Sequence, residues 1–285
     1  MEGKAEEGLD TRYRRPKRLD KAQYKTNHNQ VRTRKSSLER YLTYPSNPNN
    51  PTGQVLKKSF LQELIQLAKE KDITILSDEV YRPIFHGITP ADPDFPPSIL
   101  SMGYSKTVAT GSLSKAYSLA GIRTGWIASR DPSIIEACAK ARDYTTISVS
   151  QLDEQVAAFA LHPNTIHALL SRNITLAKTN LALLEKFVIK HDDVCEWVKP
   201  VAGTTAFIKF HRDGKAVDSK VLCERILAET GVLFVPGKEC FGDEFEGYVR
   251  VGYVPETEVV REGLEKVRLW MKKEFDDVPL AGEKA

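Results

Sequence analysis

A helical pattern followed directly by a short apolar strand constrains the fold more than any other feature. Apolar residues recur at helical spacing from Ser59 to about Lys71, and Ser59 and Gln62 have the spacing of a capping box. The run Ile73-Thr74-Ile75-Leu76 then suits a strand buried in a parallel sheet. Asp78 lies just past the carboxyl end of that strand, where open α/β sheets bind their ligands. We therefore expect an α/β fold with a site at this edge.

The other patterns divide the chain into two folded parts. In the first part we expect strands at 41–44, 108–113 and 124–128 and a helix from Pro132 that Asp131 caps. A long helical pattern covers 164–190, and the order then changes to strand 205–210, helix 219–230, strands 232–235 and 248–252, and helix 256–275. We predict part of a large domain over 38–163, a connecting helix with a small α+β domain over 164–275, and a frayed tail over 276–285.

Residues 1–37 differ in composition from the rest of the chain. They carry many Lys, Arg, Asn and Gln residues and almost no aliphatic ones. Such a segment buries too little apolar surface to offset the entropy lost on ordering. We expect a disordered basic tail, with a nuclear-localisation or phosphate-binding patch as the alternative.

Composition excludes several classes of function. No run of about 18 apolar residues occurs, so a membrane partner is not expected. The formal charge of +3 is too small to indicate a nucleic-acid partner. The four cysteines form no CxxC pair, which argues against a metal site. Because the start of the chain has no apolar signal-peptide core, we expect a cytoplasmic protein with reduced thiols.

An amine, two hydroxyls and a guanidinium occur in one loop-and-strand region. Lys115 ends the run Ser112-Leu113-Ser114-Lys115, and Arg123 follows eight residues later. A primary amine can form a Schiff base with an aldehyde cofactor, and hydroxyls with a guanidinium can hold that cofactor's phosphate. A lone loop lysine is usually a solvated surface charge, but these neighbours favour a functional one.

Two more blocks precede this one, Asn47-Pro48-Asn49-Asn50-Pro51-Thr52-Gly53 and Ser77-Asp78-Glu79-Val80-Tyr81. In order and spacing the three blocks resemble the class I/II aminotransferases, which are fold-type I pyridoxal-phosphate enzymes. The resemblance covers about residues 38–275. It implies a mostly parallel three-layer sandwich for the large domain and pyridoxal 5′-phosphate as cofactor. It also implies an α-amino acid and a 2-oxo acid as substrates, and a homodimer.

The same resemblance implies a role for each residue of the blocks. Lys115 would hold the cofactor covalently and later act as the general base that moves the proton from the substrate Cα. Asp78 would pair with the pyridine nitrogen and keep it protonated. Tyr81 and Asn50 would bond the phenolic oxygen of the cofactor. The remaining cofactor-binding residues, around the phosphate, would be Ser112, Ser114 and Arg123.

Structural interpretations of these residues stay open at this point. Asp78 is of a type that often caps a turn, Tyr81 could be ordinary half-buried packing, and Asn50 could be a turn residue before Pro51. Glu79 is expected to be structural rather than catalytic.

Arg250 interrupts the apolar strand pattern Tyr248-Val249-Arg250-Val251-Gly252. A buried arginine needs an anionic partner. The resemblance implies that Arg250 clamps the α-carboxylate of the substrate. The alternative is a surface charge on an edge strand.

The resemblance fails at the N-terminal side. Family members have a long segment before the Asn-Pro block, which supplies a Gly-rich phosphate-binding turn and an aromatic ring over the pyridine. The polar tail takes that place here, so we expect an uncovered sheet edge, exposed apolar faces and impaired catalysis.

An inactive truncated paralogue is therefore one alternative. Another alternative is a different pyridoxal-phosphate reaction, of the racemase, lyase, cyclase or oxidative type. The residues of the first two blocks slightly resemble those of family branches that modify arginine-type amino acids. A regulator with an appended winged helix is disfavoured, because residues 1–37 are too short and too polar for that fold.

Overall fold

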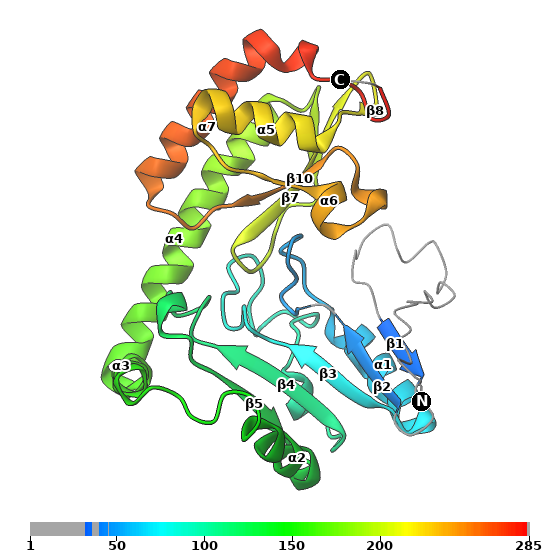
Figure 1. Ribbon diagram of the computed structural model, residues 1–285, viewed down its shortest axis with the longest axis vertical. Coiled ribbons are helices and arrows are strands. Elements are labelled where there is room, and N and C mark those ends of the chain that lie inside the picture. Colours follow the sequence, from blue (N-terminus) through cyan, green and yellow to red (C-terminus); the bar gives the residue numbers. More distant parts are fainter. Residues whose placement is uncertain (1–31, 36–39, 45, 284–285) are drawn as a thin grey trace, which may run out of the picture.

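The computed structural model describes residues 32–35, 40–44 and 46–283. They form two lobes that are joined along one side by a long helix, α4 (Pro163–Lys190) (Figure 1). Helix α3 (Gln151–Leu161) ends and α4 begins at His162, next to residue 163, where we predict the domain boundary.

The first lobe is built on a five-stranded sheet in the order β1-β2-β3-β4-β5. Its strands are β1 (Arg32–Lys35), β2 (Arg40–Tyr44), β3 (Thr74–Asp78), β4 (Thr107–Ser112) and β5 (Gly125–Ser129). β2, β3 and β4 run parallel, while β1 and β5 are antiparallel to their neighbours. The strand expected at Ile73–Leu76 is confirmed as β3, at the parallel centre of the sheet. Its two faces differ in burial, since Ile75 and Ser77 are buried and Leu76 is half-buried.

Helix α1 (Lys58–Lys71) connects β2 to β3 and covers one face of the sheet. Its apolar stripe, Leu61, Leu64, Ile65 and Ala68, packs into one cluster with Ile75 of β3 and Ala109 of β4. The predicted capping box is wrong. The helix begins one residue before Ser59, its N-cap is Lys57, and no side chain caps it.

The second lobe is an antiparallel sheet with helices against it. Its main strands run in the order β6-β7-β10-β9, namely β6 (Cys195–Trp197), β7 (Thr205–Arg212), β10 (Tyr248–Gly252) and β9 (Val235–Pro236), while β8 (Lys215–Ala216) pairs with β7. The helices are α5 (Ser219–Thr230), α6 (Gly237–Phe241) and α7 (Thr257–Glu274). The strand expected at 232–235 is shorter, since Val232 N bonds the Thr230 hydroxyl at 3.1 Å and so prolongs the exit from α5.

One apolar core runs through both lobes. It joins α4, α5, α7 and the second sheet to Leu113, Ala116 and Tyr117 of the loop after β4. The loop that carries Lys115 is therefore anchored in the same core as the second lobe.

The predictions for the two termini were partly wrong. The expected basic tail lies outside the described residues except at 32–35, which form β1 against β2. The C-terminal tail is not frayed up to residue 283. Val278 is fully buried, and the Arg212 guanidinium donates to the carbonyls of Asp276 and Val278 at 2.6 and 2.9 Å.

Large apolar side chains are exposed on β5, the last strand of the first sheet, and on the segments that follow it. Trp126 and Ile127 of β5 are exposed, and α2 (Pro132–Arg142) has no buried residue. In and before α3, Tyr144 is 91% exposed and Leu152 is 80% exposed. Among the described residues, β5 therefore ends its sheet without an outer neighbour and exposes apolar side chains.

Within the described ranges, no helix has the length and apolarity to cross a membrane. The same residues contain no group of three or more His, Cys, Asp or Glu side chains that could hold a metal ion.

Candidate active site

The predicted site residues of the first lobe gather at one edge of its sheet. The parallel strands β2, β3 and β4 all end there, and antiparallel β5 begins there, with Ser112 paired to Gly125. The Asn-Pro loop follows β2, Asp78 ends β3, Lys115 follows β4 and Arg123 precedes β5. This is the carboxyl edge at which open α/β sheets bind their ligands.

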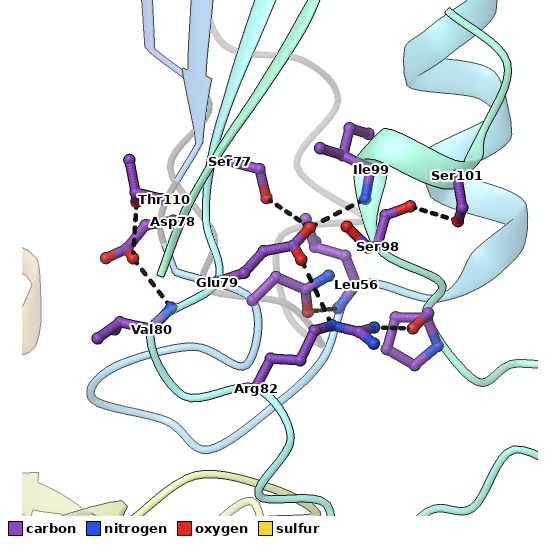
Figure 2. A network of polar contacts seen from close by, with 12 residues as sticks. Leu56, Ser77, Asp78, Glu79, Val80, Arg82, Ser98, Ile99, Ser101 and Thr110 are labelled. Carbon is purple, nitrogen blue, oxygen red and sulfur yellow. Dashed lines mark hydrogen bonds and ion pairs between the residues drawn. The ribbon is translucent and has the colours of Figure 1, made fainter. Parts of the chain in front are cut away.

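Only one carboxylate oxygen of Asp78 accepts hydrogen bonds from the described residues. Its Oδ1 accepts hydrogen bonds from the Thr110 hydroxyl and from Val80 N, both at 3.1 Å. No hydrogen bond from the described residues reaches Oδ2, which carries no dashed line in Figure 2. Val80 N in part bears out the turn-capping interpretation, but the second oxygen leaves Asp78 able to accept from a ligand.

In the Asn-Pro loop, Asn47 and Asn49 stabilise the loop itself, whereas Asn50 contacts the second lobe. Asn47 and Asn49 are buried, and each accepts a backbone N–H with Oδ1, from Leu56 at 3.0 Å and from Thr52 at 3.3 Å. Asn50 is half-buried, and its Oδ1 instead accepts from Arg250 of the second lobe at 3.3 Å. Asn50 thus reaches into the space between the lobes, which the turn interpretation alone does not explain.

Neighbouring backbone contacts attach the loop to the other site segments. Asn47 N donates to the Asp78 carbonyl at 2.8 Å. Gly53, at φ +65°, accepts at its carbonyl from the amides of Val201 and Ala202, both at 3.0 Å. The Asn-Pro loop, the end of β3 and the segment before β7 therefore form one rigid unit.

Lys115 projects from a loop whose other residues are anchored. Leu113 and Ala116 on either side are fully buried, whereas Lys115 is exposed. Its amine makes no hydrogen bond or ion pair with any residue in the described part of the chain. The backbone is fixed from within the loop, since Ser118 N donates to the Lys115 carbonyl at 3.1 Å and Leu119 N to Leu113 at 3.0 Å. The amine is thus available on a rigid support.

The two serines and Arg123 line the same turn. Ser114 N donates to Ser112 Oγ at 3.0 Å, and Ser112 Oγ lies 2.8 Å from Ser114 Oγ and 3.0 Å from the Thr124 carbonyl oxygen. Arg123 is exposed at φ +52°, and its Nη1 donates to the Ala120 carbonyl at 3.0 Å. This bond occupies one part of the guanidinium fork and leaves donors for an anion.

Tyr81 is buried between Asp78 and the second lobe. Burial raises the pKa of its hydroxyl, the Arg250 guanidinium lowers it, Asp78 raises it, and a hydrogen bond with Thr204 lowers it. The hydroxyl is therefore a neutral donor at neutral pH. These interactions also place Tyr81, Asp78 and Arg250 in one electrostatic neighbourhood.

Arg250 lies in the interior of its sheet, because β10 pairs with β7 on one side and with β9 on the other. The edge-strand alternative is therefore wrong. The side chain is half-buried, and its guanidinium stands 5.6 Å from the centre of the Phe241 ring. The Phe241 ring and the Asn50 side chain together orient the Arg250 guanidinium.

Glu79 serves the scaffold, as its sequence context indicated. Its Oε1 accepts from Ile99 N at 2.9 Å and from the Ser77 hydroxyl at 3.3 Å, and its Oε2 lies 3.5 Å from Arg82 Nε (Figure 2). This buried network holds the turn after β3 against the segment around residue 99.

The comparisons with known proteins agree with this arrangement. The sequence profile of the family "Aminotransferase class I and II" matches residues 19–267. The chain belongs to this family.

Individual relatives are similar over much of this chain but over only part of their own. Capreomycidine synthase from Streptomyces vinaceus is 32% identical over 75% of this chain and 51% of its own length. Aspartate aminotransferase from Thermotoga maritima is 29% identical over 78% of this chain and 54% of its own. The crystal structure of a PLP-dependent aminotransferase from Streptococcus suis superposes with a TM-score of 0.69 and 36% identity, over 80% of this chain and 56% of that one. The predicted fold is confirmed, and the chain spans about half the length of these relatives.

Sequence reasoning missed several residues of the site. Thr110, which directs Asp78, and Thr204, which bonds Tyr81, gave no signal. Thr110 precedes the Lys115 motif on β4 and pairs in register with Asp78, so an assigned register would have found it.

Proposed function

We propose that this chain is a pyridoxal-phosphate-dependent aminotransferase that moves an amino group between an α-amino acid and a 2-oxo acid. The observation that carries the proposal is the shared sheet edge. There the unpaired amine of Lys115 and the unused oxygen of Asp78 follow adjacent parallel strands. Membership of the family supports the same reading.

The side chains at this edge fit the chemistry of pyridoxal 5′-phosphate. Asp78 Oδ2 can accept from a protonated ring nitrogen, and Tyr81 can donate to the phenolic oxygen. The two serines and Arg123 can donate to the phosphate, for which a guanidinium is well suited. When bound, the cofactor supplies an electron-accepting ring that stabilises the charge left at the substrate Cα.

The residues themselves carry out binding and proton transfer. Lys115 would hold the aldehyde carbon of the cofactor covalently. Once its amine is free, it would act as the general base that moves the proton from the substrate Cα to the C4′ carbon of the cofactor. Asp78 would keep the ring nitrogen of the bound cofactor protonated, because an anion beside a cation favours the charged form. Thr110 and Val80 orient that carboxylate.

Arg250 is proposed to bind the substrate α-carboxylate from the second lobe. A guanidinium binds a carboxylate through two parallel hydrogen bonds, and lysine offers only a point charge. Arg250→Lys should therefore raise KM for the amino acid by about 10- to 100-fold, as expected for about 1.4 to 2.8 kcal/mol of binding energy. The control is Arg261→Lys on the exposed face of α7, which should leave KM unchanged. An Arg250→Lys enzyme with the parent KM would remove Arg250 from the site.

Product analysis tests the function. The purified chain is incubated with pyridoxal 5′-phosphate, a panel of amino acids and a 2-oxo acid acceptor, and both keto and amino products are measured. Amino transfer should be lost in Lys115→Ala and kept in Lys140→Ala, whose parent side chain is in an exposed ion pair with Glu136. Amino transfer that survives in Lys115→Ala would contradict the proposal.

A second candidate keeps the cofactor and changes the reaction. It is favoured by the 32% identity to capreomycidine synthase and by the likeness to a solved PLP-dependent cyclase, OrfR, at 26% identity and a TM-score of 0.69. A cyclase would convert its amino acid without forming a keto product from it. The same product analysis distinguishes the two reactions.

We further propose a homodimer in the cytoplasm. The apolar face around β5 and α3, with Tyr144, Leu152 and Phe159 at its surface, supports association of two copies. The four cysteines are free thiols, which suits a reducing compartment. Sedimentation velocity of the purified chain tests the dimer, and a monomer at micromolar concentration would contradict it.

A further inference from the structure

Helix α4 carries two buried asparagines on the face that packs against both lobes. Asn173 is 5% exposed and Asn180 is 0% exposed. Seven residues are nearly two helical turns, so the two side chains lie on one face, about 10.5 Å apart along the axis. Ala177 between them is also fully buried. Asparagine is a poor helix former and a costly group to bury, so each needs a partner outside the helix.

Asn173 holds the loop of the proposed catalytic amine. Its Nδ2 donates to the carbonyl of Ala116, the residue after Lys115, at 2.8 Å. Its Oδ1 accepts from Arg172 Nε and Nη2 at 3.2 and 3.0 Å. Because the guanidinium can only donate, the amide oxygen must face it and the amide NH₂ must face the loop. The orientation of this side chain is thus determined.

Asn180 holds the other lobe through its amide nitrogen alone, since its Oδ1 has no hydrogen-bond partner among the described residues. Its Nδ2 donates to the carbonyl of Pro255 at 2.8 Å. Pro255 follows β10, five residues after Arg250 and two after the fully buried Tyr253. The Tyr253 hydroxyl donates in turn to the Gly203 carbonyl at 3.1 Å, which leads into β7, the neighbour of β10. The bond therefore fixes the exit of the strand that carries Arg250.

We propose that Asn173 and Asn180 are positioning residues, which tie the Lys115 loop and the Arg250 strand to one face of α4. The inference rests on the function proposed above, in which these two groups bind the same substrate. The helix is continuous over 28 residues and joins the two lobes (Figure 1), so it sets the spacing of whatever is bonded to it. Loss of one bond should loosen one group and leave the other in place.

Hydrogen–deuterium exchange of the full chain tests this without any cofactor. Asn173→Leu should speed exchange in segment 113–119 by about 5- to 30-fold, the effect of one unmade buried hydrogen bond, and leave segment 248–256 unchanged. Asn180→Leu should do the reverse. The matched control is Asn164→Leu at the exposed start of α4, which should change neither. If both buried variants loosen both segments alike, or neither, the inference is overturned.

A second measurement tests whether loosening these segments changes cofactor capture and substrate binding at the proposed active site. The chain is incubated with pyridoxal 5′-phosphate and reduced with borohydride, and the rate of Lys115 modification is measured. The rate should fall by about 5- to 30-fold in Asn173→Leu and equal the parent rate in Asn180→Leu. With the amino acid as variable substrate, Asn180→Leu should instead raise KM. If a leucine variant does not fold, the shorter Asn→Ser replaces it, since a serine hydroxyl at either position is too short for the carbonyl.

Hydrogen exchange and Lys115 labelling together distinguish a failure of the proposed function from a failure of the positioning role. No labelling in the parent chain would reject the proposed function and leave the exchange result to stand. Parent labelling with parent-like rates and KM in both variants would reject the positioning role alone.

Discussion

His86 gives the chain a specific dependence of stability on pH. It is half-buried in the segment after Tyr81, and its Nε2 lies 2.8 Å from the hydroxyl of the fully buried Tyr253. Burial lowers the pKa of His86 from 6.5 to about 4, the Gly203 carbonyl opposes this, and Lys178 and Lys199 lower it further. His86 is therefore neutral in the folded chain at neutral pH.

The sign and size of the effect follow from proton binding. The unfolded chain takes up the proton near pH 6.5 and the folded chain only near pH 4, so stability falls as pH decreases between these values. Each pH unit in that range costs about 1.4 kcal/mol. The free energy of unfolding should lose about 2 kcal/mol from this group by pH 5, and about 3.4 kcal/mol below pH 4.

Urea unfolding at pH 7 and pH 5 measures this loss. Carboxylates titrate in every variant, so the test is the difference between the parent chain and His86→Gln, which has no proton to bind. The advantage of the parent at pH 7 should shrink by about 2 kcal/mol at pH 5. A difference between the parent and His86→Gln that stays constant with pH would refute the reasoning.

Two substitutions in the supporting structure have matched controls. Gly53→Ala should destabilise by about 2–4 kcal/mol, because φ is +65° and a Cβ there would lie 2.5 Å from Pro200 Cβ. Gly103→Ala shares a positive φ, +73°, but has nothing within 4 Å, so about 1 kcal/mol is expected; equal losses in urea unfolding would contradict this. Glu79→Gln should cost about 2 kcal/mol, since it removes the charge from a buried hydrogen-bonded ion pair. Glu63→Gln on the exposed face of α1 should cost under about 0.5 kcal/mol in the same assay, and a similar loss in both would show that the buried network contributes nothing.

Local patterns predicted the elements well where one signal dominates. The apolar run at Ile73–Leu76 gave β3, and the helix over 219–230 has the predicted ends. Asp131 caps α2 as expected, with its side chain accepting from Ser133 N at 3.0 Å. In each case the residues that decide the structure are neighbours in sequence.

The errors arose where a distant partner decides the structure. The tail after Asp276 is polar at its start and gives no helix or strand signal. It is ordered because Arg212, 66 residues before Val278, bonds its carbonyls. Ser59 has the spacing of a cap, but the chain enters α1 one residue earlier, so its hydroxyl falls inside the first turn. Local spacing could not distinguish these outcomes.

The same reason limits what the sequence tells of the site. The motifs identified Asp78 and Lys115 as candidates, since their flanking residues are contiguous. The contact between Asn50 and Arg250 joins residues 200 positions apart, and Asn173 reaches Ala116 across 57. A lone polar residue inside a strand or helix can signal that a partner exists, as Arg250 did, but not which residue the partner is. Only the packed structure brings the two together.

The most direct test of the central claim is to identify which lysine captures the cofactor. The full chain is incubated with pyridoxal 5′-phosphate, reduced with borohydride and digested, and the phosphopyridoxyl-modified peptide is located by mass spectrometry. The account predicts one saturable modification, on Lys115, that disappears in Lys115→Ala. A saturable modification on another lysine, or none at any cofactor concentration, would contradict it.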